Sequence, residues 1–217
     1  VGLKLMKQGV SKKFINGPIS KENFLKKKFN GITEYLAYRT KTEKCAMIIY
    51  NKKLSVCPIT THVPIKYVTK KINKNEIIDK VNLISIFWKQ KFNSSPKIGI
   101  TSLNPHGESI DLLNEDKKIV LPAINILKKR KFKVNGPYAA DTLFTKKNRE
   151  KFNLIIGMYH DQVLTPIKTL FEYDAINVTV GLPFVRVSPD HGPNETMLGK
   201  NLSNPLSLIR SIQFLDY

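Results

Sequence analysis

Short apolar segments alternate with polar ones along the chain, and their spacing falls into two classes. Within residues 75–92, Ile77, Val81, Ile84 and Trp88 recur every three or four positions, which places them on one face of a helix. Shorter apolar segments bounded by charged or turn-forming residues predict buried strands. The predicted strands are residues 13–16, 46–50, 54–57, 97–101 and 152–158, and further helices are predicted at 1–10, 33–38, about 118–129 and 204–217. Alternating strands and helices predict an α/β fold.

The composition is that of a globular protein. The 217 residues suffice for one large domain or two small ones, and 41% of them are apolar. No apolar run approaches the roughly 18 residues that span a bilayer, and no secretory signal is present, so we expect no membrane partner. Cys45 and Cys57 lie in apolar runs without a metal-binding or redox spacing, which favours reduced thiols and a cytoplasmic location. Because the first residue is Val1, we expect the chain to begin inside a longer protein.

The chain is strongly basic. Its 36 Lys and Arg residues outnumber its 17 Asp and Glu residues, which gives a formal net charge of +19. Such a charge fits either a nucleic-acid partner or a lysine-rich, solvated surface. Lys is spread along most of the chain, and no basic motif is interleaved with aromatic residues. We therefore favour the solvated surface and expect no nucleic-acid partner, although the charge would attract an anionic substrate.

Residues 157–195 hold the densest group of polar side chains. Residues 159–162 (YHDQ) come directly after a predicted strand, where α/β sheets place the side chains that contact ligands. Lys168, Asn177 and Arg186 follow at equal steps of nine residues (177 − 168 and 186 − 177). If they converge, they suit a phosphate group, because Arg offers a bidentate fork and Lys a point charge.

Three of the four histidines, His62, His106 and His160, each come just after a predicted strand. Neutral imidazole is a good ligand for zinc and similar metals, and three protein ligands leave one position open for a substrate. The gaps of 44 and 54 residues (106 − 62 and 160 − 106) do not force the three side chains together. A shared metal site and three unrelated strand-end histidines therefore both stay open.

The ordered pattern of YHDQ, then Lys168, then NVTVGLPFVRVSPDHG at residues 177–192 resembles the signature region of the 4-hydroxythreonine-4-phosphate dehydrogenases of pyridoxal phosphate biosynthesis. The family motifs TTH and NPH are also present, ending at His62 and His106. The resemblance implies a two-domain α/β fold of the isocitrate/isopropylmalate dehydrogenase-like kind, N-terminally incomplete here. The domains implied are the remainder of a cofactor-binding domain at 1–30 and 146–217, and an inner domain with the dimer interface at 31–145.

The resemblance also implies a reaction and a site. The reaction is the metal- and NAD(P)-dependent oxidation and decarboxylation of 4-phosphohydroxy-L-threonine to 3-amino-2-oxopropyl phosphate, in a homodimer with a shared active site. A divalent metal (Zn, Mg or Co) would acidify the substrate hydroxyl and so aid hydride loss to NAD or NADP. The residues implied are the metal ligands His62, His106 and His160, the catalytic residues Asp141 and Asp161, the substrate-binding residues Thr33, Lys168, Asn177 and Arg186, and the cofactor-binding residues His191, Gly192 and Asn204. Taken alone, Thr33 and Asp161 also fit helix caps, and Asp141 fits a loop anchor.

Several positions bear on how closely the chain follows the family pattern. Ile32 stands where the family has a His before Thr33, so one phosphate contact is expected to be lost. The loop after His106 is one residue shorter, and Thr196 occupies an acidic position of the cofactor segment, whereas Lys21 matches a family Lys. Two alternatives follow: a related dehydrogenase for another four-carbon phosphorylated hydroxy acid, or a non-catalytic fragment.

Overall fold

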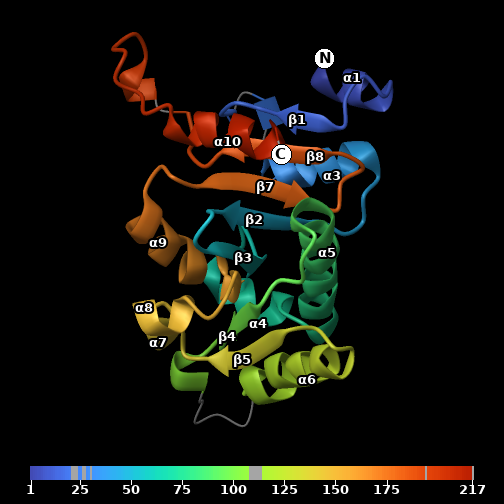
Figure 1. Cartoon of the computed structure of the whole chain (residues 1–217), viewed down its shortest axis with the longest axis vertical. Coiled ribbons are helices and arrows are strands. Elements are labelled where there is room, and N and C mark those ends of the chain that lie inside the picture. The colour runs from blue at the N-terminus through green and yellow to red at the C-terminus, as the bar shows by residue number, and fades with distance from the viewer. Residues whose placement is uncertain (21–23, 26–27, 30, 108–113, 194, 217) are drawn as a thin grey trace. The chain divides into compact units, whose positions relative to one another are not determined.

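The structure, a computed structural model, describes residues 1–217 except 21–23, 26–27, 30, 108–113, 194 and 217 (Figure 1). Lys21 therefore lies outside the described residues. The chain divides into two compact units: Val1–Asn51 with Phe171–Tyr217 forms the first unit, and Lys52–Leu170 forms the second. The domains expected from the resemblance have other boundaries, and their assignment to cofactor and dimer contacts stays a prediction.

The first unit is built on a four-stranded mixed sheet. Its elements are α1 (Gly2–Lys7), β1 (Lys13–Ile15), α3 (Ile32–Thr40), β2 (Ala46–Tyr50), β7 (Ile176–Val180), β8 (Val185–Pro189), η4 (Glu195–Met197) and α10 (Leu206–Asp216). The strand order is β1-β8-β7-β2, with β1 parallel to β8 and β7 antiparallel to both neighbours. α10 packs against β1, β7 and β8, and its Phe214 ring lies 4.8 Å from the ring of Tyr50 on β2 (between centroids).

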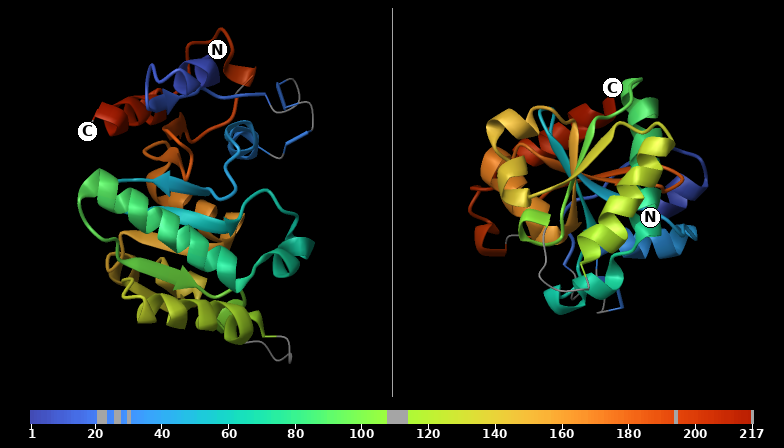
Figure 2. Two further views of the ribbon diagram at one scale, coloured as in Figure 1. Left: turned by 90° about the vertical axis from the view of Figure 1, so that its right-hand side faces the viewer. Right: turned by 90° about the horizontal axis from the view of Figure 1, so that it is seen from below.

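The second unit is built on a four-stranded parallel sheet. Its elements are β3 (Ser55–Thr60), η1 (Ile65–Tyr67), α4 (Val68–Lys71), α5 (Lys74–Phe92), β4 (Ile98–Thr101), η2 (Pro105–Gly107), η3 (Asp116–Val120), α6 (Leu121–Lys129), β5 (Val134–Tyr138), α7 (Ala140–Leu143), α8 (Lys146–Arg149), β6 (Leu154–Tyr159) and α9 (His160–Phe171), whose last residue belongs to the first unit. The strand order is β3-β6-β4-β5. Helices α5 and α6 cover one face and α7 to α9 cover the other (Figures 1 and 2). Because the four strands are parallel, their carboxyl ends lie at the same edge of the sheet.

Helix α5 shows how local sequence produces this arrangement. Asn73 caps its amino end, because its side-chain oxygen accepts a hydrogen bond of 2.9 Å from the backbone N–H of Glu76. Asn93 ends the helix in the left-handed conformation, with φ of 49°. Ile77, Val81, Ile84 and Trp88 are all buried, which confirms the apolar face predicted from their spacing. The helix packs that face against β3, α6 and η3.

The α/β class is confirmed, and the structure adds elements that the apolar pattern did not predict. Helix α9 begins at His160, directly after β6, and continues through Pro166. Strands β7 and β8 form an antiparallel pair in which Thr179 lies opposite Arg186 and Asn177 lies opposite Ser188. Asn177 and Arg186 therefore lie within strands of the first unit, and not at turns or strand ends.

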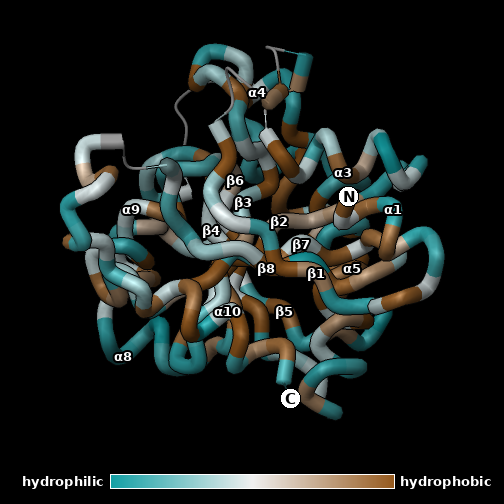
Figure 3. The backbone as a smooth tube through the Cα atoms, turned by 90° about the horizontal axis from the view of Figure 1, so that it is seen from above, coloured by the Kyte–Doolittle hydropathy of each residue, from teal (hydrophilic) through white to brown (hydrophobic). Residues whose placement is uncertain are grey.

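Hydropathy follows these elements. In Figure 3 the tube is mostly hydrophobic along β2 and mostly hydrophilic around α8. Strands β3 and β6 contain buried residues almost throughout, which is typical of a parallel sheet covered on both faces. Each helix of the described part of the chain is too short or too polar to cross a lipid bilayer.

The cap of α5 gives a stability prediction. We expect Asn73→Ala to lower the free energy of unfolding by about 0.5–2 kcal/mol, because the N–H of Glu76 loses its acceptor. The measurement is urea unfolding followed by the fluorescence of Trp88, the single Trp of the chain, which lies on this helix. Asn75→Ala, an exposed position in the same turn, is the matched control and should stay within about 0.5 kcal/mol of wild type. Equal losses in both variants would contradict the capping role.

Candidate active site

The three predicted metal ligands all follow strands of the parallel sheet in the second unit. His62 comes two residues after β3, His106 lies in η2 beyond β4, and His160 is the first residue of α9, directly after β6. Because β6 lies between β3 and β4, the three segments leave the sheet side by side. The ring centroids of His62 and His160 lie 5.7 Å apart. Two imidazoles that share one metal at bond lengths of about 2.0–2.1 Å have centroids roughly 5–6 Å apart, so this pair fits two ligands of one ion.

Asp161 holds the ring of His160. One carboxylate oxygen of Asp161 lies 2.6 Å from Nδ1 of His160, while 79% of the Asp161 side chain is exposed. A carboxylate on one ring nitrogen fixes the orientation of the ring and leaves the other nitrogen as the one that ligates a metal. Over the described ranges, no group of three or more His, Cys, Asp or Glu side chains is placed to hold a metal ion. The pair therefore supplies part of a ligand set.

His106 lies in an exposed loop with an uncommon backbone conformation. Its φ is +58°, and Gly107 follows with φ of +69°, so two successive residues are left-handed. Asp116, the first residue of η3, anchors the start of this loop. Its Oδ1 accepts a hydrogen bond of 2.6 Å from the N–H of Leu103, and its Oδ2 accepts one of 3.0 Å from the N–H of Asn104. A non-glycine residue in this region is held there by its surroundings, which favours a functional position for the imidazole.

Asp141, the other predicted catalytic carboxylate, lies in the short helix α7 after β5. Its side chain is exposed, and one oxygen accepts a hydrogen bond of 2.7 Å from the N–H of Thr142. This contact is the local anchor that the sequence alone allowed. Lys168 lies on α9 in the second unit, and its part in phosphate binding stays a prediction.

The first unit brings three of the four predicted substrate-binding residues into one polar cluster. Oγ1 of Thr33 lies 3.4 Å from Oγ1 of Thr179, and Nη1 of Arg186 donates to the same Thr179 oxygen at 3.2 Å. Asn177 lies two residues before Thr179 on β7 and therefore on the same face of the sheet. Nε of Arg186 also donates to Oδ1 of Asn16 at 2.6 Å. Gly31, and not Thr33, occupies the N-cap position of α3.

Arg186 is an uncommon residue for a protein interior, because only 1% of it is exposed. Burial lowers the pKa of its guanidinium to about 10, and the negative charge of Glu34 partly opposes this decrease. Arg186 therefore stays charged at neutral pH. The side-chain oxygen of Asn177 is also buried and, in the described part of the chain, has no hydrogen-bond partner. A charged donor and an unsatisfied amide in one cluster are suited to a polar ligand.

Sequence reasoning missed Asn16 and Thr179, which complete this cluster. Thr179 shares the alternation of β7 with Asn177, so a strand assignment at residues 176–180 would have placed both on one face. Asn16 was included in a predicted strand, yet no local signal connects it to Arg186, which is 170 residues away. Asp116 precedes the helix predicted at about 118–129, and nothing in its sequence neighbourhood indicates that it is buried.

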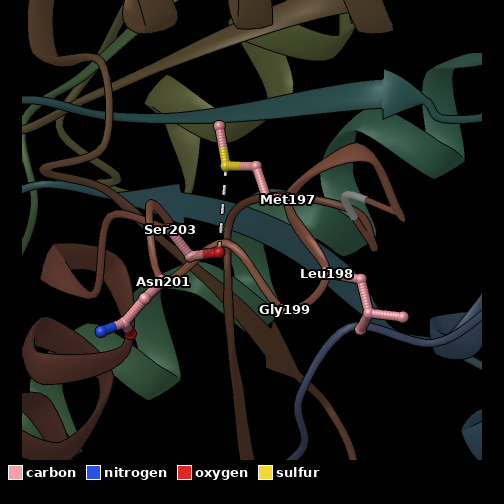
Figure 4. Close-up of a pocket in the computed structure, with 5 residues that line it drawn as sticks. All are labelled: Met197, Leu198, Gly199, Asn201 and Ser203. Carbon is pink, nitrogen blue, oxygen red and sulfur yellow. Dashed lines mark hydrogen bonds between the residues drawn. The ribbon is translucent and has the colours of Figure 1, made fainter.

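The three predicted cofactor-binding residues line one pocket of the first unit. His191, Gly192 and Asn204 surround a cavity of about 520 Å³ together with Pro18, Tyr173, Pro193, Met197, Leu202 and Ser203. Asn204 also accepts a hydrogen bond of 2.9 Å from the N–H of Leu206 at the start of α10. An adjoining pocket shares Met197 and Ser203, and there Oγ of Ser203 lies 3.9 Å from Sδ of Met197 (Figure 4).

Comparison with known proteins identifies the family. The family model described as pyridoxal phosphate biosynthetic protein PdxA matches residues 1–215. The chain belongs to the PdxA family. The 4-hydroxythreonine-4-phosphate dehydrogenase of Sulfurihydrogenibium sp. is 43% identical to this PdxA-family chain over 201 residues, which cover 90% of the chain and 62% of that protein. The D-threonate 4-phosphate dehydrogenase of Pectobacterium atrosepticum is 33% identical over 186 residues, which cover 85% of this chain and 57% of that protein.

Solved structures agree with this family. A crystal structure of 4-hydroxythreonine-4-phosphate dehydrogenase from Klebsiella pneumoniae is 30% identical, with a TM-score of 0.81, and the match covers 97% of this chain and 66% of that one. A β-decarboxylating dehydrogenase from Thermococcus kodakarensis shares the fold alone, with 13% identity and a TM-score of 0.63. The expected isocitrate/isopropylmalate dehydrogenase-like fold is confirmed. The PdxA-family chain spans about 60% of the length of the curated relatives it matches.

The buried guanidinium gives a second prediction. We expect Asn16→Ala to lower the free energy of unfolding by about 1.5–3 kcal/mol, because the charged Nε–H of Arg186 loses its acceptor. Asn16→Asp keeps the oxygen and adds a negative charge beside the guanidinium, so it should lose less. Urea unfolding followed by far-UV circular dichroism measures both. If Asn16→Asp loses as much as Asn16→Ala, the bond to Arg186 is not what Asn16 contributes.

Proposed function

We propose that the chain carries the metal and substrate sites of a 4-hydroxythreonine-4-phosphate dehydrogenase. In the proposed reaction, 4-phosphohydroxy-L-threonine and NAD or NADP give 3-amino-2-oxopropyl phosphate, carbon dioxide and the reduced nicotinamide. The names of the relatives support this proposal, since the chain belongs to their family. The structural observation that carries it is the pair of imidazoles at the ends of β3 and β6, with Asp161 bound to one of them.

His62, His106 and His160 are the proposed metal ligands, contributed by two subunits of a homodimer. When bound, a divalent ion (Zn, Mg or Co) would lower the pKa of the substrate hydroxyl and stabilise the negative charge that forms on loss of carbon dioxide. Asp161 orients His160 through Nδ1 and remains exposed, so its second oxygen is accessible to the polar end of a substrate. Asp141 is the other carboxylate proposed to approach that end.

Thr33, Asn177 and Arg186 are proposed to bind the substrate phosphate. The support is the cluster around Thr179, on the same strand face as Asn177, and the positive charge of Arg186. Lys168 is retained as a fourth phosphate ligand on the strength of the family resemblance alone. The pocket of His191, Gly192 and Asn204 is the proposed nicotinamide-cofactor site.

A second candidate substrate is D-threonate 4-phosphate. A relative of 33% identity carries the name D-threonate 4-phosphate dehydrogenase, which supports this candidate. Ile32 stands where the resemblance predicts a His, which marks a departure from the family pattern at the phosphate end that both esters share. The two substrates differ at carbon 2, which bears an amino group in one and a hydroxyl in the other.

The metal site gives a third prediction. We expect one divalent metal per chain after dialysis in the wild type, and less than about one tenth of that content in His62→Ala and His160→Ala, because each variant removes a direct ligand. Plasma mass spectrometry measures metal content, and gel filtration measures the oligomeric state. His191→Ala, an exposed histidine of the first unit, is the control and should keep its metal. Equal metal loss in all three variants would refute a site at His62 and His160.

The substrate assignment gives a fourth prediction. We expect the protein to reduce NAD or NADP with 4-phosphohydroxy-L-threonine and to release carbon dioxide, and to do so more slowly with D-threonate 4-phosphate. Ile32→His should increase kcat/KM by about fivefold, since it adds one hydrogen bond worth about 1 kcal/mol. Absorbance at 340 nm measures both. A preference for D-threonate 4-phosphate would favour the second candidate, and no reduction with either ester would refute the dehydrogenase proposal.

A further inference from the structure

The side chain of Gln162 connects the strand ends that lead to two of the proposed metal ligands. Its Oε1 accepts hydrogen bonds of 2.7 Å from the N–H of Met158 on β6 and of 2.8 Å from the hydroxyl of Thr101 on β4. Its Nε2 donates a hydrogen bond of 2.7 Å to the carbonyl of Ser102. Met158 lies two residues before His160, and Ser102 starts the loop that carries His106. One amide therefore fixes both segments at once.

Close packing leaves this amide little freedom. A Cβ atom on Gly157 would lie 2.4 Å from Cγ1 of Val163 and 3.0 Å from Oε1 of Gln162. Only glycine at this position allows the first turn of α9 to approach β6 so closely. Thr101, which donates to Gln162, and Ser102, which accepts from it, are 0% and 1% exposed. The network is thus buried and short, and such bonds are costly to break.

Two further side chains extend the network. The hydroxyl of Thr60 donates a hydrogen bond of 2.9 Å to the carbonyl of Met158. This bond connects β6 to the end of β3, two residues before His62. Asp116 is only 1% exposed. Its carboxylate accepts hydrogen bonds from the N–H groups of Leu103 and Asn104, and a third, of 3.0 Å, from Nδ2 of Asn104. The loop of His106 is therefore held at its start by Gln162 and along its course by Asp116.

We propose that Gln162 and Asp116 are positioning residues for the metal site, which fix the two chain segments that carry His160 and His106. In this proposal neither side chain binds the metal or contacts the reacting atoms. Gln162 acts through the backbone at Met158 and Ser102, and Asp116 acts through the backbone at Leu103 and Asn104. The inference rests on the proposed function, because it requires that the histidines bind a metal. Loss of such supporting groups lowers metal affinity by about 10- to 100-fold in known sites.

The test uses substitutions that keep shape and remove single bonds. Gln162→Glu keeps the acceptor oxygen but cannot donate to the carbonyl of Ser102, and Asp116→Asn replaces one acceptor oxygen with a donor. Thr101→Val removes the hydroxyl that binds Gln162, whereas Thr101→Ser keeps it and should restore wild-type behaviour. Gln90→Glu, an exposed position on α5 in the same unit, is the matched control. Each variant is compared with wild type as apo-protein by its melting temperature, and then with zinc and cobalt.

We expect Gln162→Glu and Asp116→Asn to weaken zinc binding by about 10- to 100-fold in competition with a chromogenic chelator. Both should also alter the visible absorption of the cobalt-loaded protein, a signature of ligand geometry that a loss of stability alone does not change. Thr101→Val should show the same changes in smaller degree, and Thr101→Ser and Gln90→Glu should show neither.

Two results would overturn the inference, and they are distinguishable. If the wild type binds zinc but Gln162→Glu and Asp116→Asn bind it equally well with an unchanged cobalt spectrum, the two residues support only the fold. A lower melting temperature with unchanged metal binding has the same meaning, and so does equal weakening in Gln90→Glu. If the wild type itself binds no zinc or cobalt, the metal site of the proposed function fails, and the positioning role fails with it.

Discussion

A parallel sheet covered on both faces leaves polar side chains little room except at the ends of its strands. In the second unit, β3, β6 and β4 are buried almost throughout, so their sequences are largely apolar. The first polar residues after each strand then lie at one edge of the sheet, because the strands are parallel. The closeness of His62 and His160 is a consequence of this constraint, since no local sequence spacing connects them.

Alignment of strands places the histidine segments at one edge but does not fix the separation of their ligating atoms. Loops after parallel strands are free to diverge, and a metal site requires ligand positions within a few tenths of an ångström. In the proposed site, the bonds of Gln162 and Thr60 would supply this restraint by joining segments that are distant in sequence, and Asp116 would hold the loop of His106. This explains why Gln162 directly follows the His160-Asp161 pair: its side chain reaches the neighbouring strand from the first turn of α9.

The first unit depends on a different constraint, a buried positive charge. Removing a guanidinium from water costs several kcal/mol unless its donors are satisfied and opposite charge is near. Asn16 and Thr179 accept from Arg186, and Glu34 supplies the negative charge. Because these partners are the residue that directly follows β1, a residue of β7 and a residue of α3, the charge also connects those elements. If the cluster binds a phosphate as proposed, the ligand would meet a guanidinium whose orientation is already fixed by Asn16 and Thr179.

The sequence predicted much of this structure, and its failures have physical causes. Helix α5 and the buried strands follow from periodicity, and the α/β class follows from their alternation. Helix α9 is not predicted, because Pro166 interrupts its pattern. Strands β7 and β8 are not predicted either, although both alternate apolar and polar residues as a half-buried strand does. Family resemblance supplied the candidate ligands and not their supports. Asp116, Thr179 and Asn16 act through long-range contacts, which no single sequence encodes locally.

The two candidate substrates share their phosphate, so the cluster around Arg186 cannot by itself discriminate between them. Ile32, at the phosphate end, would weaken binding of both esters alike. Discrimination between an ammonium and a hydroxyl at carbon 2 requires a charged group near that carbon, and a carboxylate favours the ammonium by a charge-assisted hydrogen bond. Asp161 and Asp141 are the exposed carboxylates proposed for that end of the substrate. Discrimination at carbon 2 is therefore expected to depend on these carboxylates, and affinity for the phosphate on the cluster around Arg186 and on Lys168.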